Sequence, residues 1–141
     1  MFAGWNTIKG SGKNTFQNQT PRGDVSMWIR VALDYNAVHC GKSPEYTYVD
    51  GENIKEFYFD DKTAKLLEED GFLSEMWSKL DALFDWGDCD YFYPEKCIKF
   101  RAWLEQRLKY PANNTLKKVY DTMLNMTNLA IEYNTGISFD F

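Results

Sequence analysis

This sequence has little histidine and cysteine and no long apolar run. It contains one histidine and three cysteines among 141 residues. Three cysteines are an odd number, so they cannot all pair, and reduced thiols are the simpler interpretation. No apolar run approaches the ~20 residues that span a bilayer, and the first residues lack the apolar core of a secretory signal. The sequence therefore predicts a cytoplasmic protein without a membrane segment.

The motif for nucleotide binding is incomplete. Residues 10–15 read GSGKNT and resemble the end of a phosphate-binding loop. The full pattern, G-x-x-x-x-G-K-[ST], requires other residues at the positions that Thr7 and Asn14 occupy. Residues 9–23 are rich in Gly, Asn, Gln and Thr, which is typical of a loop. We therefore interpret this stretch as a loop and expect no nucleotide site.

Metal and thiol sites lack the spacing that they need. A calcium loop beginning at Asp85 would require glycine and glutamate where the chain has Asp90 and Lys96. The histidine and the cysteines form no C-x-x-C pair, so the fold would have to gather them into a zinc site or an activated thiol. They are His39, Cys40, Cys89 and Cys97. We predict no metal and no cofactor, and we expect Cys97 to be a buried packing residue.

The composition suits one domain with its own core. Hydrophobic residues make up 44% of the chain and aromatic residues 17%, which is more apolar surface than a disordered chain carries. A chain of this length forms one core, and it shows neither an internal repeat nor a linker. We predict a single domain over residues 1–141.

The order of predicted elements is strands, then helices, then a final strand, which indicates an α+β fold. Helices should cover one face of a largely antiparallel sheet. The predicted strands are 25–35, 45–49, 53–59 and 137–141. The predicted helices are 61–70, 72–85, 94–109 and 115–134.

Period-two alternation supports the strands. Apolar residues alternate along 25–35, although a helix would also align several of them. The pair Asp50-Gly51 is typical of a type I′ turn, so we predict a hairpin over 45–59. Residues 137–141 alternate as well, and we expect them to return to the sheet.

Helix limits follow from capping residues and from periodicity. Asp61 can cap the first helix, and either Asn113 or Asn114 can cap the last one. Apolar residues in the second helix recur at three- and four-residue steps through Leu83 and Phe84. This pattern predicts that the second helix continues to residue 85.

Negative charge is concentrated in the middle of the chain. The net charge is −5, yet residues 45–90 alone carry 14 acidic and 4 basic side chains. Such a segment repels phosphate backbones and attracts basic partners, so we expect a basic protein partner and no nucleic acid. The alternative is that these acids only solvate turns and helix faces.

Residues 84–95, FDWGDCDYFYPE, combine acids with aromatic rings. Gly87 and Pro94 interrupt this stretch, so we predict a loop whose rings do not all enter one core. Exposed Trp and Tyr side chains dominate protein interfaces, and acids around them select a basic partner. The alternative is that the rings cover the sheet edge as a satellite cluster. The predicted partner-binding residues are Asp85, Trp86, Asp88, Asp90, Tyr91 and Tyr93.

These features favour binding over catalysis. The leading hypothesis is a small acidic protein that occludes a basic site on a toxin, nuclease or effector, as an immunity protein or a phage-encoded inhibitor does.

Two other hypotheses remain open. One is an enzyme or a small-molecule binder with a pocket between the sheet and the helices, where Arg30 would hold an anionic ligand. Its predicted lining residues are Trp28, Arg30, Trp77 and Trp103. The other is a homodimer that pairs through an edge strand at 137–141.

Overall fold

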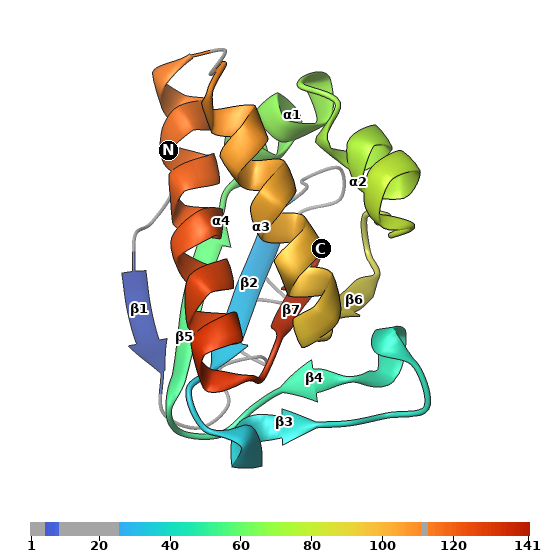
Figure 1. Cartoon of the computed structure of the whole chain (residues 1–141), viewed down its shortest axis with the longest axis vertical. Coiled ribbons are helices and arrows are strands. Elements are labelled where there is room, and N and C mark those ends of the chain that lie inside the picture. The colour runs from blue at the N-terminus through green and yellow to red at the C-terminus, as the bar shows by residue number, and fades with distance from the viewer. Residues whose placement is uncertain (1–4, 9–25, 111–112) are drawn as a thin grey trace.

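The computed structural model describes residues 5–8, 26–110 and 113–141. In these residues the chain has the predicted α+β fold, with helices packed over an antiparallel sheet (Figure 1). The loop predicted at 9–23, with its GSGKNT motif, lies outside the described residues.

Five strands of the described chain form the main sheet, in the order β1-β5-β2-β7-β6, and all neighbours are antiparallel. They are β1 (Trp5–Ile8), β2 (Met27–Ala32), β5 (Ile54–Phe59), β6 (Cys89–Phe92) and β7 (Ile137–Asp140). A second sheet has two short strands, β3 (Val38–His39) and β4 (Tyr48–Val49). Two 3₁₀ turns precede them, η1 (Tyr35–Ala37) and η2 (Pro44–Tyr46).

The described helices are α1 (Asp61–Glu69), α2 (Phe72–Leu80), α3 (Pro94–Leu108) and α4 (Asn114–Tyr133). Figure 1 shows α3 and α4 lying side by side across the sheet. None of these helices combines the length and the apolar character that crossing a bilayer would require.

The predicted alternation in 25–35 is confirmed as a strand. Met27, Ile29 and Val31 of β2 are buried in the core that the helices share. Because successive side chains of a strand point to opposite faces, Trp28 and Arg30 belong to the other face of the sheet. The strand is preferred over the helix because both of its neighbours, β5 and β7, pair with it along its length.

The predicted hairpin over 45–59 is wrong. β4 pairs with β3, whereas β5 pairs with β1 and β2. The Asp50 amide donates to the carbonyl of Ala37 at 3.0 Å, so the chain ahead of the turn is bonded to the small sheet. The positive φ values fall at Gly51 and Asn53, which are not adjacent as a type I′ turn requires. The hairpin is instead β2–β5, and residues 33–53 are its long connection.

The edges of the sheet also differ from the prediction. β7 lies between β2 and β6, so residues 137–141 offer no free edge for a homodimer. β6 is an edge strand, although its residues were interpreted as loop. It has only four residues, and its acidic residue Asp90 interrupts the apolar pattern that would have marked it.

Two of the predicted helix caps can be compared with the structure. Asn113 caps α4, because its side-chain oxygen accepts from the Leu116 amide at 2.8 Å. The cap of α1 is Asp60, which accepts from the Thr63 amide at 2.9 Å, and Asp61 is the first helical residue. The prediction for α1 was therefore displaced by one residue.

The second helix is shorter than predicted. α2 ends at Leu80 because Asp81 adopts a left-handed conformation with φ +60°. The Ala82 amide then donates back to the carbonyl of Met76 at 3.0 Å, which closes the helix. Residues 81–85, predicted as helix, are neither helix nor strand in the structure. They form part of the surface described below.

Gly136 permits a close approach between the start of β7 and β6. Its φ is +104°, a conformation that side chains disfavour. A Cβ at this position would lie 2.4 Å from the carbonyl oxygen of Phe92 and 2.7 Å from the ring of Tyr91. The absence of a side chain at Gly136 therefore allows the start of β7 to pack directly against β6.

The substitution Gly136→Ala is expected to lower the free energy of unfolding by about 3 kcal/mol or more, because backbone strain of ~1–2 adds to overpacking of ~1–3. Gly87→Ala is the matched control. Gly87 also has positive φ, +93°, but nothing lies within 4 Å of its Cβ position. Urea denaturation of both variants checks the difference, and equal losses would contradict the proposed close contact.

Candidate functional site

Residues 81–85 form an alternating segment at the end of α2. Ala82 and Phe84 are buried, whereas Asp81, Leu83 and Asp85 are exposed. Leu83 is 70% exposed, although the helix prediction placed it on a buried face. Phe84 contacts the rings of neighbouring strands, so the segment is held firmly while its outer side chains face solvent.

A tight turn begins at Asp85 and presents one more carboxylate, that of Asp88. The Asp85 carboxylate accepts from the Trp86 amide at 2.9 Å, and the Asp88 amide donates to the Asp85 carbonyl at 3.2 Å. The carbonyl of Asp88 accepts from the Phe141 amide at 3.0 Å, which ties the turn to the end of β7. The side chains of Asp85 and Asp88 are both exposed, as predicted for a partner surface.

The rings predicted as anchors lie mostly inside the molecule. Tyr91 is 2% exposed, and its hydroxyl donates to the carbonyl of Thr135. The hydroxyl of Tyr93, which is half-buried, lies 2.8 Å from Oγ1 of Thr47. Because Tyr91 is buried, it cannot contribute to a partner-facing surface. Tyr91 and Tyr93 together hold the connection 33–53 against the sheet.

Trp86 has an intermediate position. It is half-buried and meets the Phe141 ring edge to face at a centroid distance of 5.4 Å. Its indole nitrogen is buried without a hydrogen-bond partner. Trp86 therefore packs between the turn and Phe141 and does not project fully into solvent.

Asp90 is held differently from the exposed acids. It is half-buried, and its carboxylate accepts from the Tyr91 amide at 2.7 Å. Burial raises the pKa of Asp90; the Tyr91 amide and Lys96 offset this in part, and nearby Glu45 adds to it. Its side chain is thus less accessible to a partner than those of the exposed Asp85 and Asp88.

The 3₁₀ turn η2 adds to the same region. It packs against β6, which brings Glu45 close to Asp90. Tyr46 in this turn is 66% exposed and Glu45 is exposed too. We refer to the exposed side chains of η2 and of the segment 81–88 together as the acidic edge. Its members are Glu45, Tyr46, Asp81, Leu83, Asp85 and Asp88.

Four members of the acidic edge were not among the predicted partner-binding residues: Glu45, Tyr46, Asp81 and Leu83. A two-residue period in Asp81-Ala82-Leu83-Phe84-Asp85 would have marked the segment, but the three- and four-residue spacing of the same apolar residues favoured a helix. Glu45 and Tyr46 had no signal, because their nearness to β6 arises from a long-range contact.

The alternative ligand-binding residues do not share one pocket. Trp28 and Arg30 lie on the sheet face opposite the helices, whereas Trp77 is an exposed residue of α2 and Trp103 packs against the helix-covered core. The structure therefore does not form the predicted pocket between sheet and helices from these four residues.

The charge of Arg30 is already compensated. Its guanidinium pairs with Glu56 and lies 3.4 Å from the Asp140 carboxylate. It also stacks over the Trp28 ring at 5.2 Å. Burial raises the pKa of Glu56, and Arg30 counteracts that rise. With two carboxylates beside it, Arg30 does not offer a free positive charge to an anionic ligand.

The thiols are free and dispersed. Cys97 is fully buried in the core, as predicted, while Cys40 and Cys89 are exposed. Burial and the neighbouring Asp140 raise the pKa of Cys89 to about 11, so its thiol stays protonated at neutral pH. Within the described residues, no three or more His, Cys, Asp and Glu side chains gather as a metal site.

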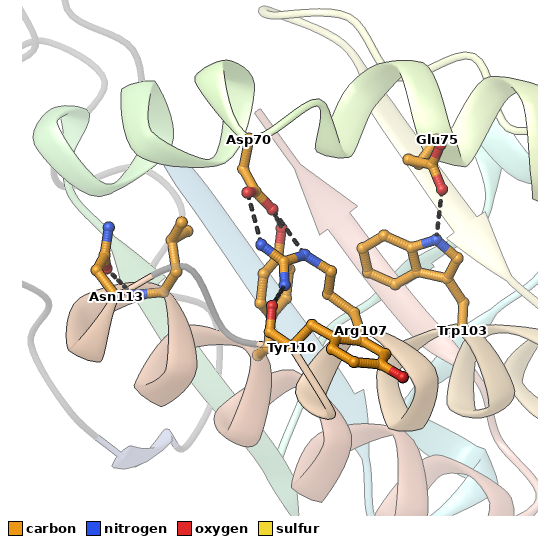
Figure 2. A network of polar contacts seen from close by, with 8 residues as sticks. Asp70, Glu75, Trp103, Arg107, Tyr110 and Asn113 are labelled. Atoms are coloured by element: carbon orange, nitrogen blue, oxygen red, sulfur yellow. Dashed lines mark hydrogen bonds and ion pairs between the residues drawn. The ribbon is translucent and has the colours of Figure 1, made fainter.

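Trp103 lines a groove of about 450 Å³ between α2 and α3. Its indole donates to the Glu75 carboxylate at 3.0 Å (Figure 2). The other lining residues are Lys79, Ala102, Gln106, Arg107 and Tyr110.

Asp70 joins three helices at one end of this groove. Its carboxylate accepts from Nε and Nη2 of Arg107 at 3.0 and 2.7 Å, and from the Tyr120 hydroxyl at 2.6 Å (Figure 2). Burial alone would raise the pKa of Asp70, but the hydrogen bonds from Arg107 and Tyr120 outweigh it and hold the pKa below its usual value. The ionised carboxylate therefore stabilises the packing of α1, α3 and α4.

Asp70→Asn is expected to lower the free energy of unfolding by about 2 kcal/mol at pH 7, because it weakens charge-assisted hydrogen bonds. A carboxyl with a depressed folded pKa stabilises above its unfolded pKa of ~3.9, and the contribution fades as pH falls through the lower folded value. The loss should thus shrink between pH 4 and pH 2 in urea titrations.

Asp121→Asn is the control for this change. Asp121 pairs with Lys117 at 2.8 Å on the exposed face of α4, and such a pair contributes at most about 0.5 kcal/mol. A pH-independent loss in Asp70→Asn, or an equal loss in the control, would contradict the role assigned to Asp70.

Comparison with known proteins finds no family model that matches this chain, no similar curated protein and no similar solved structure.

Proposed function

We propose that this protein is a binding module that uses the acidic edge to engage a basic surface on another protein. The observation that carries the proposal is the exposure of Leu83. Its side chain is 70% exposed between Asp81 and Asp85, although both adjacent residues are buried. Folding gains little from an exposed leucine, and an apolar side chain flanked by two exposed acids offers a partner both an apolar contact and negative charge.

The segment that carries Leu83 is preorganised. Phe84 packs at centroid distances of 4.8 Å from Phe139 and 5.4 Å from Phe92, and the hydrogen bond from Phe141 to Asp88 fixes the following turn. A partner would therefore bind a surface that is already ordered, and less conformational entropy would be lost on binding.

Charge defines the kind of partner. The exposed acids of the edge are Glu45, Asp81, Asp85 and Asp88, and a surface of one sign accelerates encounter with the opposite sign. We expect the partner to present lysine or arginine around an apolar socket that receives Leu83. Tyr46 would add a second contact, since tyrosine has a large ring and a hydroxyl that can bond at an interface.

An inhibitor of the immunity type would act in this way. Covering a basic active-site or nucleic-acid-binding surface of a toxin, nuclease or effector blocks access to it without any chemistry on the part of the inhibitor. We further propose a cytoplasmic location, which is supported by three free cysteines in a chain that forms no disulfide.

A peptide-display selection tests this function. Random peptides selected on the full-length protein should be enriched in lysine and arginine next to a large apolar residue. Leu83→Ser should weaken binding of the selected peptides by about tenfold or more, because a buried apolar contact worth ~1.4 kcal/mol or more is lost. Asp85→Lys should weaken them and reduce the salt dependence of binding.

Two variants outside the acidic edge serve as matched controls. Ile98→Ser removes an exposed apolar side chain of α3, and Glu105→Lys reverses an exposed acid of the same helix. Neither should change peptide affinity. Selected peptides without basic residues, or affinity that is insensitive to both edge variants, would refute the proposed function.

A further inference from the structure

The groove between α2 and α3 has two contrasting walls. Glu75 and Lys79 lie on α2, one helical turn apart, and Trp103 lies on α3. Ala102 leaves space between them because its side chain is short, and Tyr110 stands at one end. The volume of about 450 Å³ is within the range of small-molecule sites.

The aromatic wall is rigid. The Trp103 ring meets the rings of Phe72 and Tyr120 edge to face, at centroid distances of 5.8 and 5.5 Å. Its indole nitrogen is fixed by Glu75 at 3.0 Å. A ligand ring placed against Trp103 would meet a surface whose position is already set.

Arg107 lines the groove, but its guanidinium is already bonded within the protein. Asp70 accepts from two of its nitrogens, and the third nitrogen donates to the Tyr110 carbonyl (Figure 2). This saturation leaves Glu75 and Lys79 as the charges that the groove can offer to a ligand.

Glu75 and Lys79 do not neutralise each other. Such neighbours on a helix commonly pair, with their Cβ atoms about 6 Å apart. Here Glu75 Oε1 is turned to Trp103, and no described residue forms an ion pair with the exposed Lys79. The wall thus carries one negative and one positive group a single turn apart.

We propose that this groove binds a small zwitterion with an aromatic ring, of the chemical class of the aromatic amino acids. The α-ammonium would donate to the second oxygen of Glu75, and Lys79 would donate to the α-carboxylate. The side-chain ring would lie against Trp103 and Tyr110. A simple anion or cation would satisfy one of the two charges and leave the other without a partner.

Comparing L-phenylalanine with two analogues tests the proposal on the unmodified protein. 3-Phenylpropionate lacks the ammonium and 2-phenylethylamine lacks the carboxylate. In amide chemical-shift titrations, L-phenylalanine should bind about tenfold more tightly than either analogue, because each loses one charge-assisted hydrogen bond. The shifts should be confined to residues 75–79 and 102–110.

Variants then assign each charge. Lys79→Gln should lower the affinity for L-phenylalanine to that for 2-phenylethylamine, and it should leave the affinity for 2-phenylethylamine unchanged. The control Lys99→Gln replaces an exposed lysine of α3 and should change neither affinity. Equal affinity of the three ligands, no binding of L-phenylalanine, or shifts outside the groove would overturn the proposal. Leu83→Ser should bind L-phenylalanine normally, so this test is independent of the acidic edge.

Discussion

Insertion of Phe84 into the core is the contact on which the exposed surface of this protein depends. Its ring lies at centroid distances of 4.8 to 5.4 Å from Phe139, Phe141 and Phe92, and so joins the chain after α2 to the end of the sheet. Burying an aromatic side chain of this kind contributes on the order of 2–3 kcal/mol. Because residue 84 points inward, residues 83 and 85 must point outward, and a packing contact thereby sets which groups a partner can reach.

The two surfaces proposed for binding differ in the physics of recognition. The acidic edge has charges of one sign, whose field extends to about a Debye length and attracts a partner before contact. The groove beside Trp103 has one charge of each sign, which largely cancel at a distance and act only within hydrogen-bond range. The first surface suits a large basic partner, whereas the second suits a small molecule with a matching pair of charges.

Local patterns were sufficient for much of the fold. The alternation of Met27, Ile29 and Val31 and the cap at Asn113 both correspond to elements of the structure. The errors have a common origin. The pairing of β4 with β3, the central place of β7 and the strand at 89–92 depend on contacts between segments distant in sequence, which turn residues and periodicity do not encode.

The sequence was enough to show that negative charge is concentrated between residues 45 and 90, that apolar content suffices for one core, and that the chain combines strands with helices. These are properties of composition and short-range periodicity. Three features follow only from long-range packing: Tyr91 is buried, Leu83 is exposed, and Glu45 lies near Asp90. For Leu83 the reason is that 81–85 satisfies both a helical and an alternating pattern, and Phe84 packs among rings from β6 and β7 that are distant in sequence. For Tyr91 and Glu45 it is the contact between η2 and β6, which joins segments far apart along the chain.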